Sequence, residues 1–130
     1  MLVDDDRLIL FTLGEALRAM GFDVLSASSG EAALKLAREA NPDLAVCDVR
    51  MPGMSGLVLA RHLREETKVP FIFLSAYSSD EEGGRLAAEH GALGYLMKPV
   101  DVTSILPTIQ AALARAAALR TLSGRRIGNN

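Results

Sequence analysis

The feature that most constrains this chain is a short apolar run, residues 44–47, that ends abruptly on Asp48. Pro52 and Gly53 follow and predict a loop, and Ser55 stands in the position of a helix cap. This pattern places the Asp48 carboxylate at the carboxyl end of a buried strand. Ligands bind at that edge of open α/β sheets, so Asp48 is a candidate functional residue.

Two further apolar runs, residues 2–3 and 95–97, also end on charged side chains. The charged residues that follow them are Asp4, Asp5, Asp6 and Lys98. Taken alone, the three acids are typical of a solvated loop. If the strands are parallel, however, these groups meet Asp48, where two carboxylates about 4 Å apart repel by roughly 4 kcal/mol at an effective dielectric constant near 20. A hard divalent cation suits such oxygen ligands, so we expect Mg²⁺ here.

Strands and helices alternate along the sequence, which predicts a parallel sheet with helices on both faces. The expected strands are residues 1–3, 22–27, 44–47, 69–74 and 94–97, and the expected helices are residues 7–20, 29–40, 57–64, 78–90 and 103–122. Ser28 and Glu31 have the form of a capping box for the second helix. The first strand is shorter than the usual 5–6 residues or so, which means either that residues precede Met1 or that the strand is clipped.

Length and composition fit one domain, residues 1–122, followed by a tail over 123–130 that reads as disordered. A formal net charge of -2 gives no overall attraction to nucleic acid or to a membrane surface. The acidic start does not resemble a signal peptide, so the cytoplasm is the expected location. The single Cys47 excludes an internal disulfide and is expected to pack as a small hydrophobe, with a redox role as the alternative.

Together these motifs resemble the receiver domain of two-component response regulators. The resemblance rests on the acidic pair Asp4-Asp5, on Asp48 followed by Met51-Pro52 and Gly56, on Ser75-Ala76, and on Lys98-Pro99, in the family's order and spacing. It extends to about Leu113. It implies a flavodoxin-like, doubly wound sheet of five parallel strands in the order 2-1-3-4-5 with five helices.

The resemblance also assigns roles to individual residues. Asp48 would accept a phosphoryl group from a histidine kinase or a phosphotransfer protein, helped by Ser75 and Lys98, and Tyr95 would be the switch aromatic. The expected Mg²⁺ ligands are Asp5 and Asp48 directly, Asp4 through water, and Arg50 through its backbone carbonyl. The bond before Pro99 is expected to be cis.

The resemblance further implies a homodimer face formed by residues 78–90, 94–97 and 103–122. The output is a transcriptional or antitermination response or a relay, and the long last helix looks like that of receivers that precede an RNA-binding antitermination module. The segment itself is not expected to bind nucleic acid or to act as an enzyme beyond its own phosphorylation and dephosphorylation. Two alternatives stay open: a pseudo-receiver that acts without phosphorylation, and a metal-dependent phosphatase, in which Arg50 stands where a second acid is expected.

Overall fold

The fold of the chain is described by a computed structural model, which covers residues 1–76 and 79–124. Five parallel strands form one sheet in the order β2-β1-β3-β4-β5, as the resemblance to receiver domains implies. The strands are β1 (Leu2–Val3), β2 (Ser26–Ala27), β3 (Ala45–Asp48), β4 (Phe71–Ser75) and β5 (Tyr95–Met97). The helices are α1 (Arg7–Ala19), α2 (Gly30–Ala40), α3 (Gly56–Glu66), α4 (Asp80–His90) and α5 (Val102–Gly124).

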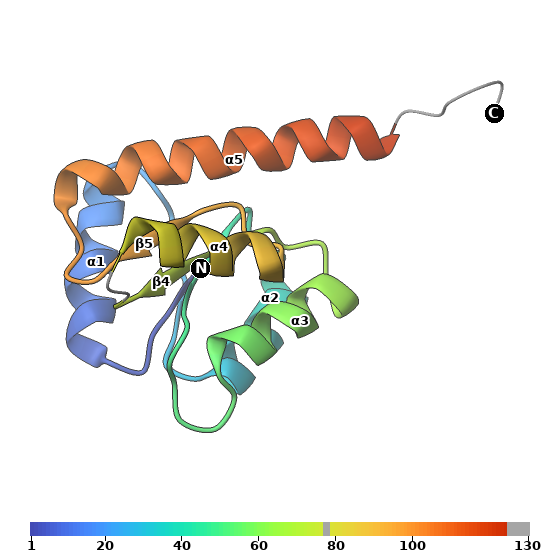
Figure 1. Cartoon of the computed structure of the whole chain (residues 1–130). Coiled ribbons are helices and arrows are strands. Elements are labelled where there is room, and N and C mark those ends of the chain that lie inside the picture. Colours follow the sequence, from blue (N-terminus) through green and yellow to red (C-terminus); the bar gives the residue numbers. More distant parts are fainter. Residues whose placement is uncertain (77–78, 125–130) are drawn as a thin grey trace, which may run out of the picture.

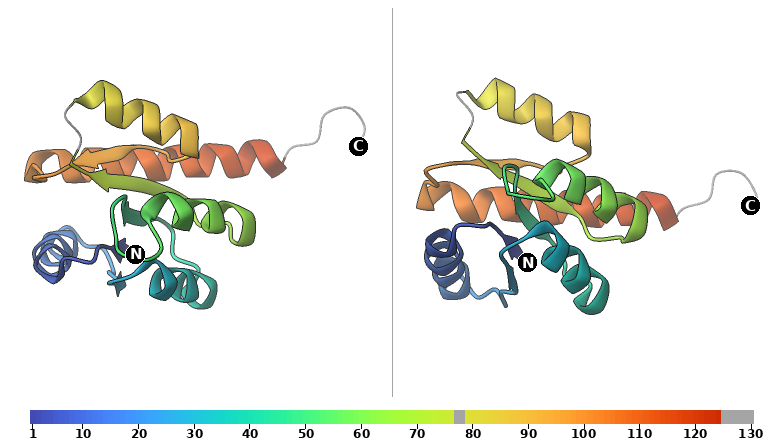
Figure 2. Two further views of the ribbon diagram at one scale, coloured as in Figure 1. Left: turned by 60° about the horizontal axis from the view of Figure 1, so that its bottom comes forward. Right: turned by 90° about the horizontal axis from the view of Figure 1, so that it is seen from below.

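The helices divide between the two faces of the sheet (Figures 1 and 2). One buried cluster joins Val3, Cys47 and Phe73 to side chains from α2, α3 and α4. The other joins Leu2 and Val46 to side chains from α1 and α5. Alternate strand residues therefore serve opposite cores, because successive side chains of a strand point to opposite faces.

Two local predictions are wrong. The strand expected over 22–27 is reduced to Ser26–Ala27, because a strand needs a partner and β1 begins only at Leu2, which pairs with Ser26. The cap of α2 is Ser29, whose side chain accepts a hydrogen bond from the N–H of Ala32, and not Ser28. Ser29 occupies the extended conformation that a cap residue requires.

The last helix is the longest element and extends past the end of the sheet in Figure 1. Ile105, Ile109, Ala112 and Ala116 are buried, but Leu119 is 50% exposed. The helix ends at Gly124, two residues beyond the predicted boundary at 122, while 125–130 of the predicted tail lie outside the described residues. Pro107 is the sixth residue of this helix, so it lies early in it, as expected.

The stretch Val102–Leu122 is long and apolar enough to cross a membrane by length and composition alone. A helix that packs on the core of a soluble domain meets the same criterion, so this stretch is weak evidence for membrane insertion. Its buried side chains pack against the sheet, which accounts for part of its apolar character.

Candidate phosphorylation site

Asp48 is the last residue of β3, and the chain turns sharply after it. The N–H of Gly56, the first residue of α3, donates to the carbonyl of Val49 at 2.9 Å. Ser55 caps this helix by accepting a hydrogen bond from the N–H of Val58, as the sequence predicts. A Cβ atom at Gly56 would lie 2.1 Å from the carbonyl oxygen of Asp48, so only glycine allows this close return of the chain.

We expect Gly56→Ala to lower the free energy of unfolding by about 1–3 kcal/mol, because the clash is with backbone that cannot rotate away. Urea unfolding measures the loss. The matched control is Gly84→Ala in α4, where the added Cβ would meet Tyr95 at an ordinary 3.6 Å. Since alanine favours a helix over glycine by about 0.5–1 kcal/mol, this control should be neutral or stabilising. Equal stability of the two variants would contradict the account.

The acids that follow β1 take different positions. Asp4 is fully buried, and its Oδ1 accepts a hydrogen bond of 2.9 Å from the N–H of Asp6. Asp6 is exposed and caps α1 by accepting from the N–H groups of Leu8 and Ile9. This capping role was not predicted, although an Asp directly before the first helical residue is the usual signal for it. Asp5 is exposed beside Asp4 and Asp48.

Lys98 follows β5, and its peptide bond to Pro99 is cis, as expected. The Lys98 Nζ lies 2.9 Å from Asp4 Oδ2 and 3.3 Å from Asp48 Oδ1, so one cation faces two buried carboxylates. The Lys98 ammonium is the ion-pair partner of Asp4 Oδ2, and this oxygen accepts no other hydrogen bond among the described residues.

The pocket makes Asp48 a weaker acid than a free aspartate. Burial, with the nearby Asp4 carboxylate as the second cause, raises the pKa of Asp48 from 3.8 to about 6, although Lys98 and the Arg50 N–H act in the opposite direction. Desolvation acts to lower the pKa of Lys98, but Asp4 and Asp48 outweigh it, so that pKa is raised. The site therefore carries more negative charge than its single cation offsets.

A pocket of about 280 Å³ gives access to these groups. It is lined by Asp4, Asp5, Asp6, Asp48, Arg50, Ser75, Ala76 and Lys98. Ser75 is buried at the end of β4, and its carbonyl accepts a hydrogen bond of 2.8 Å from the N–H of Lys98. Every predicted metal or phosphoryl-contacting residue thus lines one cavity; of the predicted site residues only Tyr95 lies elsewhere.

Asp4, Asp5 and Asp48 each offer one carboxylate oxygen, and these oxygens lie within 4.8 Å of one another. Hard divalent cations bind oxygen ligands of this type. Three carboxylates face one lysine here, and this excess of negative charge fits a bound cation, so the residues present can hold a metal.

The comparisons with known proteins agree with this geometry. The family described as the response regulator receiver domain matches residues 1–110. The chain belongs to this family. PdtaR, a transcriptional regulatory protein of Mycobacterium tuberculosis, is 32% identical over 125 residues, which is 95% of this chain and 60% of PdtaR. ZraR of Escherichia coli, also a transcriptional regulatory protein, is 38% identical over 88% of this chain and 26% of its own length.

A solved structure described as a response regulator from Chloroflexus aurantiacus superposes on this receiver domain with a TM-score of 0.80 and 32% identity. That match covers 88% of this chain and 95% of the other. Receiver domains of two-component systems are in general signalling modules and not enzymes. The receiver domain spans less than two thirds of the transcriptional regulators it matches, so the output of a whole protein is a separate question.

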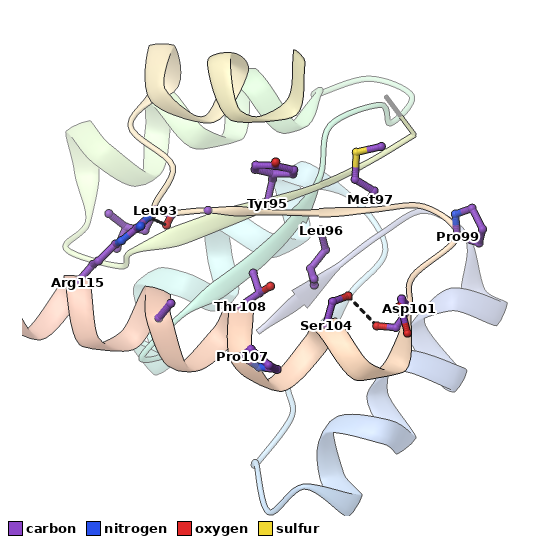
Figure 3. A pocket seen from close by; sticks show the side chains of 12 residues that line it. Leu93, Tyr95, Leu96, Met97, Pro99, Asp101, Ser104, Pro107, Thr108 and Arg115 are labelled. Carbon is purple, nitrogen blue, oxygen red and sulfur yellow. Dashed lines mark hydrogen bonds between the residues drawn. The ribbon is translucent and has the colours of Figure 1, made fainter. Parts of the chain in front are cut away.

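Two further residues singled out in the sequence, Tyr95 and Cys47, do not line this pocket. Tyr95 is half-buried, and its ring points toward α4 in Figure 3. A Cβ atom added at Gly83 of α4 would lie 2.9 Å from this ring. Cys47 precedes Asp48 in β3, and burial raises the pKa of its thiol to about 12. A thiol with this pKa stays protonated near neutral pH, which favours the packing role predicted for it.

Proposed function

We propose that the chain is a phosphoacceptor that switches a signalling output when Asp48 is phosphorylated. The observation that carries this proposal is the ion pair of the Lys98 Nζ with two buried carboxylates, those of Asp4 and Asp48, at the edge of an accessible pocket. A structural ion pair alone needs only one acid for one cation. The surplus of carboxylates is better explained by a site that binds a cation and a phosphoryl group.

In the proposed reaction, a carboxylate oxygen of Asp48 attacks the phosphorus of a phosphohistidine on a histidine kinase or phosphotransfer protein. An O–P bond forms as the P–N bond of the donor breaks, and the released imidazole takes up a proton. The Lys98 ammonium offsets the charge of the phosphoryl oxygens, and the Ser75 hydroxyl donates a hydrogen bond to one of them.

Asp5 and Asp48, with Asp4 through water and the carbonyl of Arg50, would hold Mg²⁺ in this pocket. The ion supplies positive charge next to the phosphoryl oxygens. Arg50 also stands two positions after Asp48, where an aspartate-based phosphatase needs a second acid, so steady turnover of external phosphate esters is not expected.

Phosphorylation adds about -1.5 to -2 units of charge and three acceptor oxygens to the pocket. Ser75 ends β4 and pairs in register with Met97 of β5. A shift of Ser75 toward the phosphoryl group would therefore change the packing around Tyr95, which is also in β5. We expect Tyr95 to turn inward as Ser75 moves. The adjacent glycines 83 and 84 lie against its ring and make α4 easy to move, so this helix can shift as the ring turns.

The face formed by α4, β5 and α5 is the proposed output and homodimer surface. It carries a groove of about 530 Å³ between β5 and α5, in which Leu93, Pro107 and Arg115 are labelled in Figure 3. In the cytoplasm this surface would pass the signal to a transcriptional or antitermination module or to a relay partner. The regulators PdtaR and ZraR, matched over part of their length, favour an output on gene expression.

A titration with beryllofluoride, a mimic of the phosphoryl group, separates this proposal from a pseudo-receiver. With Mg²⁺ present we expect bound fluorine signals by NMR, a change in the Tyr95 ring signals, and a shift toward dimer in sedimentation. Without Mg²⁺ none of the three should change. Absence of bound fluoride in the presence of Mg²⁺ would favour the pseudo-receiver; binding without a Tyr95 change would exclude only the switch.

A further inference from the structure

The loop between β3 and α3, residues 49–55, carries part of the phosphorylation site. The N–H of Arg50 makes a hydrogen bond with the Asp48 carboxylate, and the Arg50 carbonyl is a proposed Mg²⁺ ligand. The loop is closed at its base by the hydrogen bond from the N–H of Gly56 to the carbonyl of Val49. The contact that holds its far end therefore also affects where the Arg50 peptide lies.

The far end of the loop packs on the first turn of α2 (Figure 2). A Cβ atom added at Gly30 would lie 2.7, 2.8 and 2.9 Å from the Cβ, Cγ and Sδ atoms of Met54. The Met54 side chain thus lies along the Gly30 backbone, where only a hydrogen atom leaves room for it. Gly30 is buried, and Met54 packs against the core cluster that contains Val3 and Cys47. The contact therefore joins the loop to α2 through the interior of the molecule.

This contact, and not the backbone conformation, explains the glycine at position 30. Gly30 is the first residue of α2 and has no positive φ angle, unlike Gly21, Gly53 and Gly91. An alanine would fit that conformation and would favour the helix. The lack of a side chain at position 30 is therefore required by the packing of Met54.

A second contact joins the same two segments. Gly53, directly before Met54, turns the loop with a φ of +71°, and a Cβ atom there would lie 3.5 Å from Oε1 of Glu31. Glu31 is exposed, so we assign the main role to the buried contact between Gly30 and Met54. Among the residues that the structure describes, none from α2 lines the phosphorylation pocket, so the first turn of α2 reaches the pocket through this loop.

We propose that Gly30 and Met54 are positioning residues of the phosphorylation site: the Met54 side chain, packed on the Gly30 backbone, holds the loop so that the Arg50 peptide faces Asp48. This inference rests on the proposed function. A side chain at position 30 cannot be accommodated by a change of the Met54 rotamer, because the nearest atom is the Met54 Cβ, which is fixed to the backbone. The backbone of the loop must move instead, and it carries the Arg50 carbonyl that would contact Mg²⁺.

Gly30→Ala tests the proposal, with Gly14→Ala as the matched control. Gly14 lies in α1, where an added Cβ would meet the flexible end of Arg18 at 3.4 Å. We expect Gly30→Ala to raise the dissociation constant of Mg²⁺, measured by calorimetry on the folded, unphosphorylated chain, by at least about tenfold, as is typical when groups that support metal ligands are changed. Gly14→Ala should change this constant by less than about twofold.

A double-mutant cycle distinguishes this contact from a general loss of stability. Met54→Gly removes the Cβ atom that meets position 30, so adding Gly30→Ala to it should change the dissociation constant of Mg²⁺ by less than about twofold. Met54→Gly alone should weaken Mg²⁺ binding, because the loop loses its contact with α2. Equal effects of Gly30→Ala in the two backgrounds would overturn the proposal.

Hydrogen exchange in the metal-free chain gives a readout that does not depend on Mg²⁺. Gly30→Ala should speed exchange at the amides of Arg50 and Gly56 by at least about tenfold more than at Val46, whose exchange reports the stability of the sheet. Exchange at Arg50 that changes no more than exchange at Val46 would contradict the positioning role.

Met54→Ala replaces Gly30→Ala in both measurements if the latter does not fold, with Met20→Ala at the end of α1 as its control. It should loosen the loop and speed exchange at Arg50 in the same way, whereas Met20→Ala should not. If the original chain binds no Mg²⁺, the proposed function fails in its metal site. The exchange rates of the metal-free variants then still decide whether Gly30 and Met54 position the loop.

Discussion

Replacing Asp48 with Asn should lower phosphoryl uptake from a small acyl phosphate by at least about a thousandfold, because the variant lacks the attacking carboxylate. The same change should stabilise the metal-free fold at pH 7. Burial and the Asp4 carboxylate raise the pKa of Asp48 to about 6, so the ionised form of this group opposes folding. We expect Asp48→Asn to increase the free energy of unfolding by about 1–2 kcal/mol in the absence of Mg²⁺.

The sign of the pH dependence follows from the same pKa. The folded chain holds the Asp48 proton up to about pH 6, whereas the unfolded chain releases it near 3.8. The stability that this group contributes is complete below the lower value and is lost as the pH rises through the upper one. Urea unfolding from pH 4 to 7 should show this loss in the original chain and not in Asp48→Asn. Asp43→Asn, which changes an exposed acid ahead of the same strand, is the control and should behave like the original chain.

Replacing Lys98 with Met should lower the free energy of unfolding by about 2–3 kcal/mol at pH 8 without Mg²⁺, because it leaves two buried carboxylates without their cation. The methionine keeps most of the apolar stem, so the loss reports the charge. The variant should recover part of this stability as the pH falls through about 6, where Asp48 takes up a proton. Added Mg²⁺ should also recover part of it, since a cation again faces the carboxylates.

Lys68→Met is the matched control, because Lys68 is exposed and makes no ion pair among the described residues. It should change stability by no more than about 0.5 kcal/mol. If Lys98→Met were as stable as this control at pH 8, the charge balance described for the pocket would be wrong.

The phosphorylation pocket could be predicted from the sequence because parallel strands bring their carboxyl ends to one edge. Asp4, Asp48 and Lys98 each follow or end an apolar run, so the alternation of strands and helices predicts that they meet, whereas Ser75 was identified only by the resemblance to receiver domains. The close return of the chain at Gly56 could not be predicted in the same way. Its cause is the close contact of Gly56 with the Asp48 carbonyl. This contact depends on the conformation of the loop between the two residues, which the sequence pattern does not specify.

The other differences have the same origin in tertiary context. Residues 22–25 have the apolar, extended pattern of a strand, but β1 begins at Leu2, which pairs with Ser26, so β2 begins only there. Ser28 and Ser29 are equally good caps by residue type. The direction in which the chain leaves β2 makes Ser29 the cap residue of α2. Sequence patterns thus predict which elements form, while the neighbouring segments decide where each begins.

The most direct test of the central claim is to locate the phosphoryl group on the chain. The protein is incubated with a small acyl phosphate and Mg²⁺, the acyl phosphate on the protein is reduced with borohydride, and the modified residue is identified by peptide mass mapping. The account predicts a single modification at Asp48, absent when the metal is chelated. Modification at another residue, or at Asp48 to the same extent with the metal chelated, would contradict it.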